Sequence, residues 1–219
     1  MRRLIALAAL LATPAEAAER RWPVGSIERL RIEAPVTVRV VTGGGKGVRG
    51  TATDRATLDA LDLRVDGTTL TIRAPRGSTA PAEIVIATPR LDTIMLFAPA
   101  TVRIDTLRGA CATVSIAGAG SVEVARVDAE RFDATLVGEG AISAAGRATE
   151  ARLAGNGPGT IDTAALSAER TVVQAAGDLI VRASARSAAT ITAGPDAQVT
   201  MSGHRQCTIR AATPANVHC

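Results

Sequence analysis

The chain has 219 residues, a formal net charge of +4 and a hydrophobic content of 47%. Its only aromatic residues are Trp22, Phe97 and Phe132, which excludes a core filled by aromatic side chains. Arginines and carboxylates are interleaved along the chain, and this pattern argues against a basic surface for nucleic acid. The length suits one domain, or one domain with a small annex.

Residues 1–17 have the pattern of a cleaved secretory signal peptide. Arg2 and Arg3 precede an apolar run from Leu4 to Ala12, and 15–17 is a small-x-small cleavage site. This run is far shorter than the roughly 20 residues that a membrane span needs. We therefore expect an exported mature chain that does not span a membrane after cleavage. Its expected location is the periplasm or the cell surface of a Gram-negative-type bacterium.

The sequence of residues 18–91 predicts a short β-rich N-terminal portion, which also caps the repeats that follow it. We expect a strand over 36–40, a Gly-rich turn over 43–47 and a short helix over 54–61. The Asp66-Gly67 pair favours a tight hairpin. A cap is needed because an open solenoid end exposes apolar side chains and unpaired strand edges.

Residues 92–202 repeat with a period of about 20. Gly-rich corners recur, as at 118–120, 138–140 and 155–157, with apolar residues on both sides at a spacing of two. One aligned row follows the corners: Val102, Val122, Ile142, Ile161, Leu179 and Val199. A second row precedes them: Leu96, Ile116, Leu136, Leu153, Val173 and Ile191.

A spacing of two marks strands with one face inward, and about 20 residues is too short for a βαβ unit. We therefore predict an all-β fold, a right-handed parallel β-helix with coils of about 20 residues. The alternative is an antiparallel sandwich or barrel with strands at a spacing of about 8–12 residues. Like residues recur at the longer period and not in mirror order, which favours the β-helix.

Residues 203–219 form a predicted closing segment at the C-terminal end. Cys207 and Cys219 lie close in sequence, and an exported protein meets an oxidising compartment, so we predict a disulfide between them. Cys111 is left over. It is expected either as a buried free thiol or as an intermolecular link.

Over roughly residues 22–210 the chain resembles the putative auto-transporter adhesin head GIN domain family. The matching segments are Val36-Thr37-Val38, Leu61-x-Leu63, Gly67-x-x-Leu70-x-Ile72 and Pro89-x-Leu91, followed by the repeated apolar-small-Gly-x-Gly-x-apolar units. The resemblance implies a β-helical fold and an envelope or surface location in bacteria. It carries over no catalytic residues.

Candidate catalytic and metal-binding residues are sparse. A β-helical enzyme on envelope polysaccharide needs a pair of carboxylates, and Asp105, Asp128, Asp133 and Asp162 are available. The short coils leave no long loops to wall a cleft, so we predict no catalytic residues and no enzyme activity. A zinc site from the two histidines and two cysteines His204, His218, Cys207 and Cys219 has suitable ligand types, but the disulfide is the better use of the thiols. We predict no cofactor and no metal site.

Two surface features complete the predictions. Glu130, Glu150 and Glu169 recur at steps of 20 and 19 beside arginines, which indicates a stacked ladder, either compensated by the arginines or binding a weak Ca²⁺. The outward side chains of Ala117, Val137 and Ala154 form a small apolar face suited to self-association or to a partner.

The function that we predict from the sequence is a non-enzymatic, adhesin-like binding or structural protein of the cell envelope or surface. Its partner is an envelope or surface macromolecule and not nucleic acid. Two alternatives remain, the polysaccharide enzyme and a carrier of a small apolar ligand such as a lipid.

Overall fold

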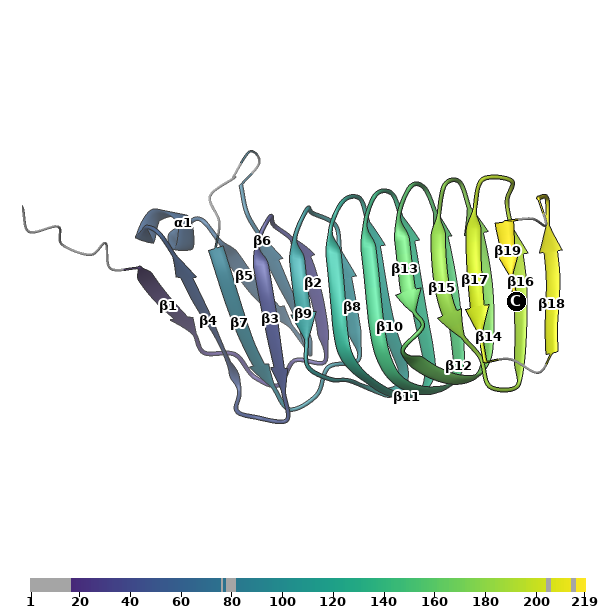
Figure 1. The fold of residues 1–219 in the computed structure, drawn as a ribbon. Helices are drawn as coiled ribbons and strands as arrows, with labels where there is room; N and C mark the ends of the chain where they lie inside the picture. The colour runs from purple at the N-terminus through teal and green to yellow at the C-terminus, as the bar shows by residue number, and fades with distance from the viewer. Residues whose placement is uncertain (1–16, 76, 78–81, 204–205, 214–215) are drawn as a thin grey trace, which may run out of the picture.

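The structure is a computed structural model that describes residues 17–75, 77, 82–203, 206–213 and 216–219. All but the last residue of the predicted signal peptide, and the candidate ligand His204, therefore lie outside the described residues. The chain forms a rod of stacked coils with strands on two broad faces (Figure 1). The predicted all-β parallel β-helix with coils of about 20 residues is confirmed.

The N-terminal part contains nine strands and one helix: β1 (Ala18–Trp22), β2 (Arg29–Glu33), β3 (Thr37–Thr42), β4 (Gly47–Ala52), α1 (Arg55–Asp59), β5 (Asp62–Asp66), β6 (Thr69–Arg73), β7 (Ala82–Thr88), β8 (Thr93–Leu96) and β9 (Thr101–Ile104). The remaining strands are β10 (Leu107–Ala117), β11 (Ser121–Val137), β12 (Ala141–Asn156), β13 (Thr160–Thr163), β14 (Leu166–Ala176), β15 (Ile180–Ser184), β16 (Ala188–Ala193), β17 (Gln198–Ser202), β18 (Gln206–Ala211) and β19 (Val217–His218).

Each coil contributes one strand segment to each face. Face 1 runs, in spatial order, through β5, β6, β2, β8, β10, the later part of β11, the later part of β12, β14, β16 and β18. Face 2 runs through β1, β4, β7, β3, β9, the first parts of β11 and β12, then β13, β15, β17 and β19. Strands β11 and β12 are long because each continues from face 2 around the rod to face 1 (Figure 1).

Inward side chains from both faces fill the interior with aliphatic rows. Val102, Val122, Ile142 and Ile161 are in register and at most 1% exposed. The next member of the row is Val181, so the predicted place of Leu179 in it is wrong by two residues. The interior polar groups Thr163 and Thr171 donate hydrogen bonds to backbone carbonyls, which removes the cost of burying them.

The predicted Gly corners are built from stacked glycines. Gly118, Gly138, Gly157 and Gly177 have φ values of 113°, 112°, 118° and 66°, a region that L side chains rarely occupy. Successive corners also stack closely, because a Cβ on Gly138 would lie 2.9 Å from the carbonyl oxygen of Gly118. The third corner begins at Gly157, two residues later than predicted. As a result Leu136 is in register with Gly155, and Leu153 is not its neighbour in the row.

The first coil of the solenoid does not lie at the end of the rod. Strand β2 pairs in parallel with both β6 and β8, and β3 pairs in parallel with both β7 and β9. The β2–β3 coil is therefore inserted between two coils that follow it in sequence. Beyond β6 and β7 the pairing becomes antiparallel through β5, β4 and β1. The predicted hairpin lies between β5 and β6, with Gly67 at φ 57°.

The predicted helix is present as α1, next to β1 and β4 (Figure 1). The carboxylate of Asp54 caps it by accepting a hydrogen bond from the Thr57 amide at 2.7 Å, as expected of an N-cap residue. Leu58 is fully buried and anchors the helix to the core.

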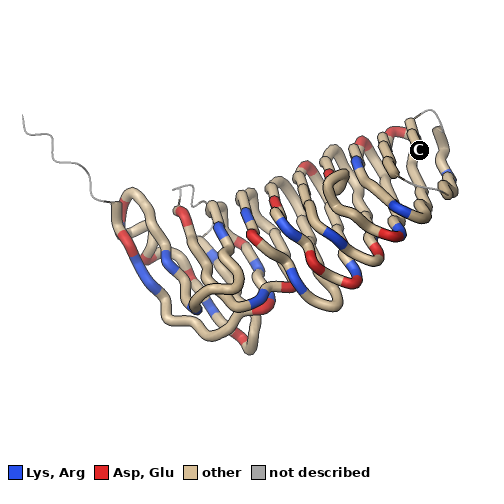
Figure 2. Tube along the Cα trace, turned by 60° about the horizontal axis from the view of Figure 1, so that its bottom comes forward, with Lys and Arg blue, Asp and Glu red and all other residues tan. Residues whose placement is uncertain are grey.

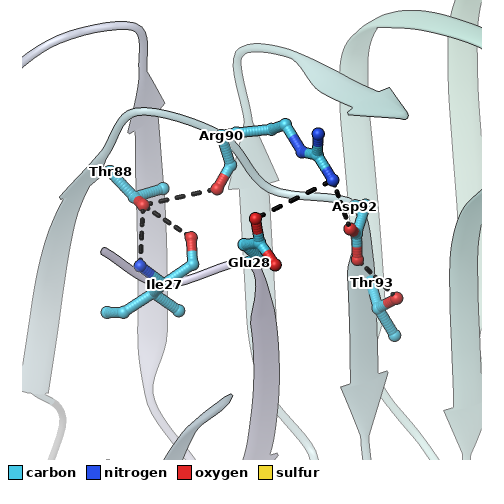
Figure 3. Close-up of polar contacts among 6 residues, drawn as sticks. All are labelled: Ile27, Glu28, Thr88, Arg90, Asp92 and Thr93. Atoms are coloured by element: carbon cyan, nitrogen blue, oxygen red, sulfur yellow. Dashed lines mark hydrogen bonds and ion pairs between the residues drawn. The ribbon is translucent and has the colours of Figure 1, made fainter. Parts of the chain in front are cut away.

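A buried hydroxyl joins the start of the first coil to the end of β7 (Figure 3). Thr88 is fully buried. Its Oγ1 donates to the carbonyl oxygen of Ile27 at 2.6 Å and accepts from the Ile27 amide at 3.1 Å. Next to it, Arg90 lies 3.3 Å from the Asp92 carboxylate and 3.8 Å from that of Glu28. These contacts hold together chain segments 61 residues apart.

Candidate binding face

The corner-proximal end of face 1 carries a shallow apolar depression of about 380 Å³. Its lining includes Val137 of β11, Ala154 of β12, and Gln174 and Ala176 of β14. The side chain of Val137 is 53% exposed. In one outward row the short side chain of Ala154 lies between the longer side chains of Thr135 and Gln174. An apolar hollow of this kind suits contact with another molecule.

A second depression, of about 510 Å³, adjoins the first and shares Thr135, Ala154 and Gln174 with it. Its floor is charged, because Glu150 and Arg152 of β12 line it. Together the two depressions form one groove across β11, β12 and β14, apolar at the corner end and ionic at the other. We call this the face 1 groove.

The Glu150 carboxylate is held by two arginines, one on its own strand and one on β11. Arg152 donates to it through Nε and Nη2 at 3.1 and 3.0 Å, and Arg131 lies 3.6 Å away. The hydrogen bond from Arg152 is the main reason that the pKa of Glu150 lies below its ordinary value. The charge of Glu150 is thus compensated within the protein.

Similar clamps hold other carboxylates on the surface. Glu33 accepts hydrogen bonds from Arg73, at 2.7 Å, and from Arg31, and these bonds hold the pKa of Glu33 below its ordinary value. Asp128 accepts a bond from Arg147 at 2.9 Å, which lowers its pKa. Basic and acidic residues are interspersed along the whole rod (Figure 2).

The predicted glutamate ladder is wrong. Glu150 is in register with Arg131 on one side and Arg170 on the other. The local register steps are 19 and then 20 residues, whereas the glutamates are spaced by 20 and then 19, so Glu130 and Glu169 miss Glu150 by one residue. A one-residue offset places a side chain on the opposite side of the strand. Charges therefore alternate, and a stacked carboxylate site for Ca²⁺ does not form.

The predicted disulfide between Cys207 and Cys219 is present, and it removes both thiols from the hypothetical zinc site. His218 lies on β19. Cys111 is exposed, so the prediction of a buried thiol is wrong. Neighbouring atoms still desolvate part of its sulfur, and this is the main cause of a raised Cys111 pKa, followed by its hydrogen bond to Asp133 at 3.2 Å.

The candidate aspartates do not form a carboxylate pair. Asp128, Asp133 and Asp162 are each in register with an arginine on an adjacent strand, and Asp105 follows β9 on the exposed surface. Among the residues described, no group of three or more His, Cys, Asp or Glu side chains is placed to hold a metal ion. The described part of the chain also contains no helix with the length and apolar character needed to cross a membrane.

The structure places Ala117, Val137 and Ala154 on the outward side of face 1. Ala117 and Val137 are in register, whereas Ala154 pairs with Thr135 in the next row. Sequence reasoning missed the polar members of the groove, which are Thr135, Asn156, Gln174 and Thr192. No motif identifies these residues, because only the register shows which outward positions are neighbours.

Comparison with known proteins places this fold in a family. The family model described as "Putative auto-transporter adhesin, head GIN domain" matches residues 27–204. No curated protein matches the chain. The crystal structure of a putative adhesin from Bacteroides fragilis is similar with a TM-score of 0.75 at 16% identity, covering 90% of this chain and 93% of that one.

Two proteins of Parabacteroides distasonis have the same fold. A putative adhesin aligns with a TM-score of 0.67 at 12% identity, covering 94% of this chain and 97% of that one. A protein described as a putative lipid binding protein aligns with a TM-score of 0.63 at 13% identity and the same coverage. At these identities the likeness shows the fold alone. The family match over most of the chain shows that the protein belongs to the putative auto-transporter adhesin head GIN domain family.

Proposed function

We propose that this protein is an exported, non-enzymatic binding module of the cell envelope or surface that recognises a macromolecule through the face 1 groove. The observation that carries the proposal is the exposed apolar end of the groove, where Val137 is 53% exposed and lines the depression together with Ala154 and Ala176. Covering exposed apolar side chains of this kind with a second surface lowers the free energy. Membership in an adhesin family supports a surface role.

The partner that we test first is a second copy of the chain. Val137→Arg places a charge in the apolar end of the groove and should reduce the self-association measured by light scattering. Ala141→Arg is the matched control, because Ala141 is also exposed but lies on face 2. A wild-type protein that is monomeric at all concentrations would exclude self-association and leave an envelope macromolecule as the partner.

The location is tested with an epitope-tagged copy in intact cells. We expect an external protease to digest the tag before permeabilisation, as befits an adhesin-like protein. Protection until the outer membrane is permeabilised would contradict a surface role and favour a periplasmic partner.

The lipid carrier is retained as the second candidate because a structural neighbour is described as a lipid binding protein. Rows of buried side chains, with Phe132 as the largest, fill the solenoid interior. A lipid would therefore have to bind on the outer surface. Mass spectrometry of lipids that co-purify with the protein tests this candidate.

A further inference from the structure

Face 2 carries a row of arginines at its N-terminal end, away from the face 1 groove. Arg21 of β1 is in register with Arg49 of β4, and Arg39 of β3 is in register with Arg103 of β9. Val85 of β7 lies between the two pairs, in register with both Arg49 and Arg39. The five strands lie side by side at one end of the rod (Figure 1). We call these four side chains the arginine row.

The carboxylates nearby neutralise this row only in part. Glu19 is shared by Arg21, at 2.7 Å, and Arg49, at 3.3 Å. Glu123 pairs with Arg103 at 3.3 Å.

Within the described residues, Arg39 forms no ion pair although it lies directly opposite another arginine. Lys46, in the loop before β4, forms none either. Like charges on paired strands repel across a spacing of about 4.8 Å, so the row favours an anion above it. Glu83, the remaining carboxylate on this part of β7, is exposed and is in register with two threonines.

A hollow of about 570 Å³ opens beside the row. Its floor is apolar, formed by Val41, Val85 and Ala87, which are half-buried on the outward side of β3 and β7. The floor stays open because the residue opposite Ala87 on β4 is Gly47. The volume lies in the range of about 300–1,000 Å³ that is typical of small-molecule sites.

The rim of the hollow is cationic. Arg21, Lys46 and Arg49 line it together with Pro23, whereas Trp22 is in register with buried Val48 and its ring packs inward against the core. A glycan would find few stacking platforms and an apolar floor here, so the chemistry of the site favours an amphiphile.

We infer that this part of face 2 is a docking site for an anionic lipid surface. The arginine row and Lys46 bind phosphate-bearing headgroups, while Val41, Val85 and Ala87 contact acyl chains at the leaflet boundary. Attraction of this kind is worth about one kcal/mol per basic residue and weakens as salt rises. The inference goes beyond the proposed function, since it uses a different face and a different partner.

The test measures flotation of the purified protein with lipid vesicles. Vesicles of phosphatidylcholine containing about one part in five of phosphatidylglycerol should bind the wild type, and pure phosphatidylcholine vesicles should not. Arg39→Gln removes the cation that has no partner and should weaken binding about fivefold. Val85→Glu places a carboxylate between two arginines and should weaken binding about tenfold or more.

The matched control is Arg182→Gln. Arg182 lies in the same outward row of face 2, at the other end of the rod, where it faces Asp162 at 3.7 Å. This variant should bind within about twofold of the wild type. Circular dichroism checks folding, and Arg39→Gln carries the test alone if Val85→Glu is misfolded.

Three results would overturn the inference. One is wild-type flotation by Arg39→Gln, and another is an equal loss in the Arg182→Gln control. The third is that inorganic phosphate or dextran sulfate alone occupies the site and displaces the protein from vesicles, with no requirement for a lipid surface. The site would then recognise an anion or an anionic glycan. None of these results depends on the face 1 groove, so the proposed function is tested separately.

Discussion

The buried hydroxyl of Thr88 should be one of the most sensitive single groups in the fold. Thr88→Val keeps the size of the side chain but removes the oxygen that bonds both the amide and the carbonyl of Ile27. These two backbone groups would then be left without their partner at a site where Thr88 and Ile27 are both fully buried.

An unsatisfied buried polar group costs about 1–3 kcal/mol, so we expect Thr88→Val to lower the free energy of unfolding by about 2–4 kcal/mol. For a chain of this size each kcal/mol shifts the melting temperature by about 2–4 °C. The melting temperature should therefore fall by roughly 5–15 °C. Thermal unfolding followed by circular dichroism and urea unfolding both measure this change.

Two control variants separate the hydroxyl from other effects. Thr88→Ser keeps the hydroxyl and loses one methyl group, which should cost only about 1 kcal/mol. Thr200→Val makes the same chemical change on the exposed side of face 2 and should stay within about 0.5 kcal/mol. The reasoning fails if Thr88→Ser is as unstable as Thr88→Val, or if Thr88→Val matches the wild type.

Three further changes should alter stability by distinct mechanisms. Gly146→Ala should lower the free energy of unfolding by about 3 kcal/mol or more in urea unfolding. The reason is that Gly146 has φ 123° and an added Cβ would lie 2.6 Å from the Val127 amide nitrogen. The control Gly44→Ala, where the added Cβ meets open space, should leave the stability unchanged. Reducing the Cys207–Cys219 bond should cost about 3 kcal/mol and lower the melting temperature, with no effect of reductant on the Cys207→Ser variant. Because the pKa of Glu33 is lowered in the folded state, its ionised form stabilises the fold above the ordinary pKa of 4.5, and this contribution is lost as the pH falls through the folded-state pKa. Glu33→Gln should therefore flatten the acid side of the plot of stability against pH. An unchanged plot would contradict the role of the two arginines at Glu33.

The period and the inward rows could be predicted from sequence because each is a local pattern. Alternating apolar residues mark each coil, and positive-φ glycines mark the four corners at Gly118, Gly138, Gly157 and Gly177, whatever the neighbouring coils do. The disulfide was predictable for the same reason, since Cys207 and Cys219 lie within one short segment.

Register between coils could not be predicted in the same way. Coil lengths differ by one or two residues, and the pairing shifts between Val124 and Val127, where β11 turns from one face to the other. Spacing along the sequence therefore misplaced the neighbours of Glu150, and it put Leu153 beside Leu136. The groove depends on these neighbours, so its composition required the structure.

The inserted β2–β3 coil has a consequence for the order in which the protein folds. From β10 onward, each new coil meets its neighbour about 20 residues earlier, so later coils can add one at a time as the chain is synthesised. The first coil must wait, because Val38 pairs with Ile84 on one side and Val102 on the other. Such distant contacts slow folding. A nascent chain that ends before β9 (Thr101–Ile104) thus exposes at least one bare side of its first coil, with unpaired strand edges open to other chains.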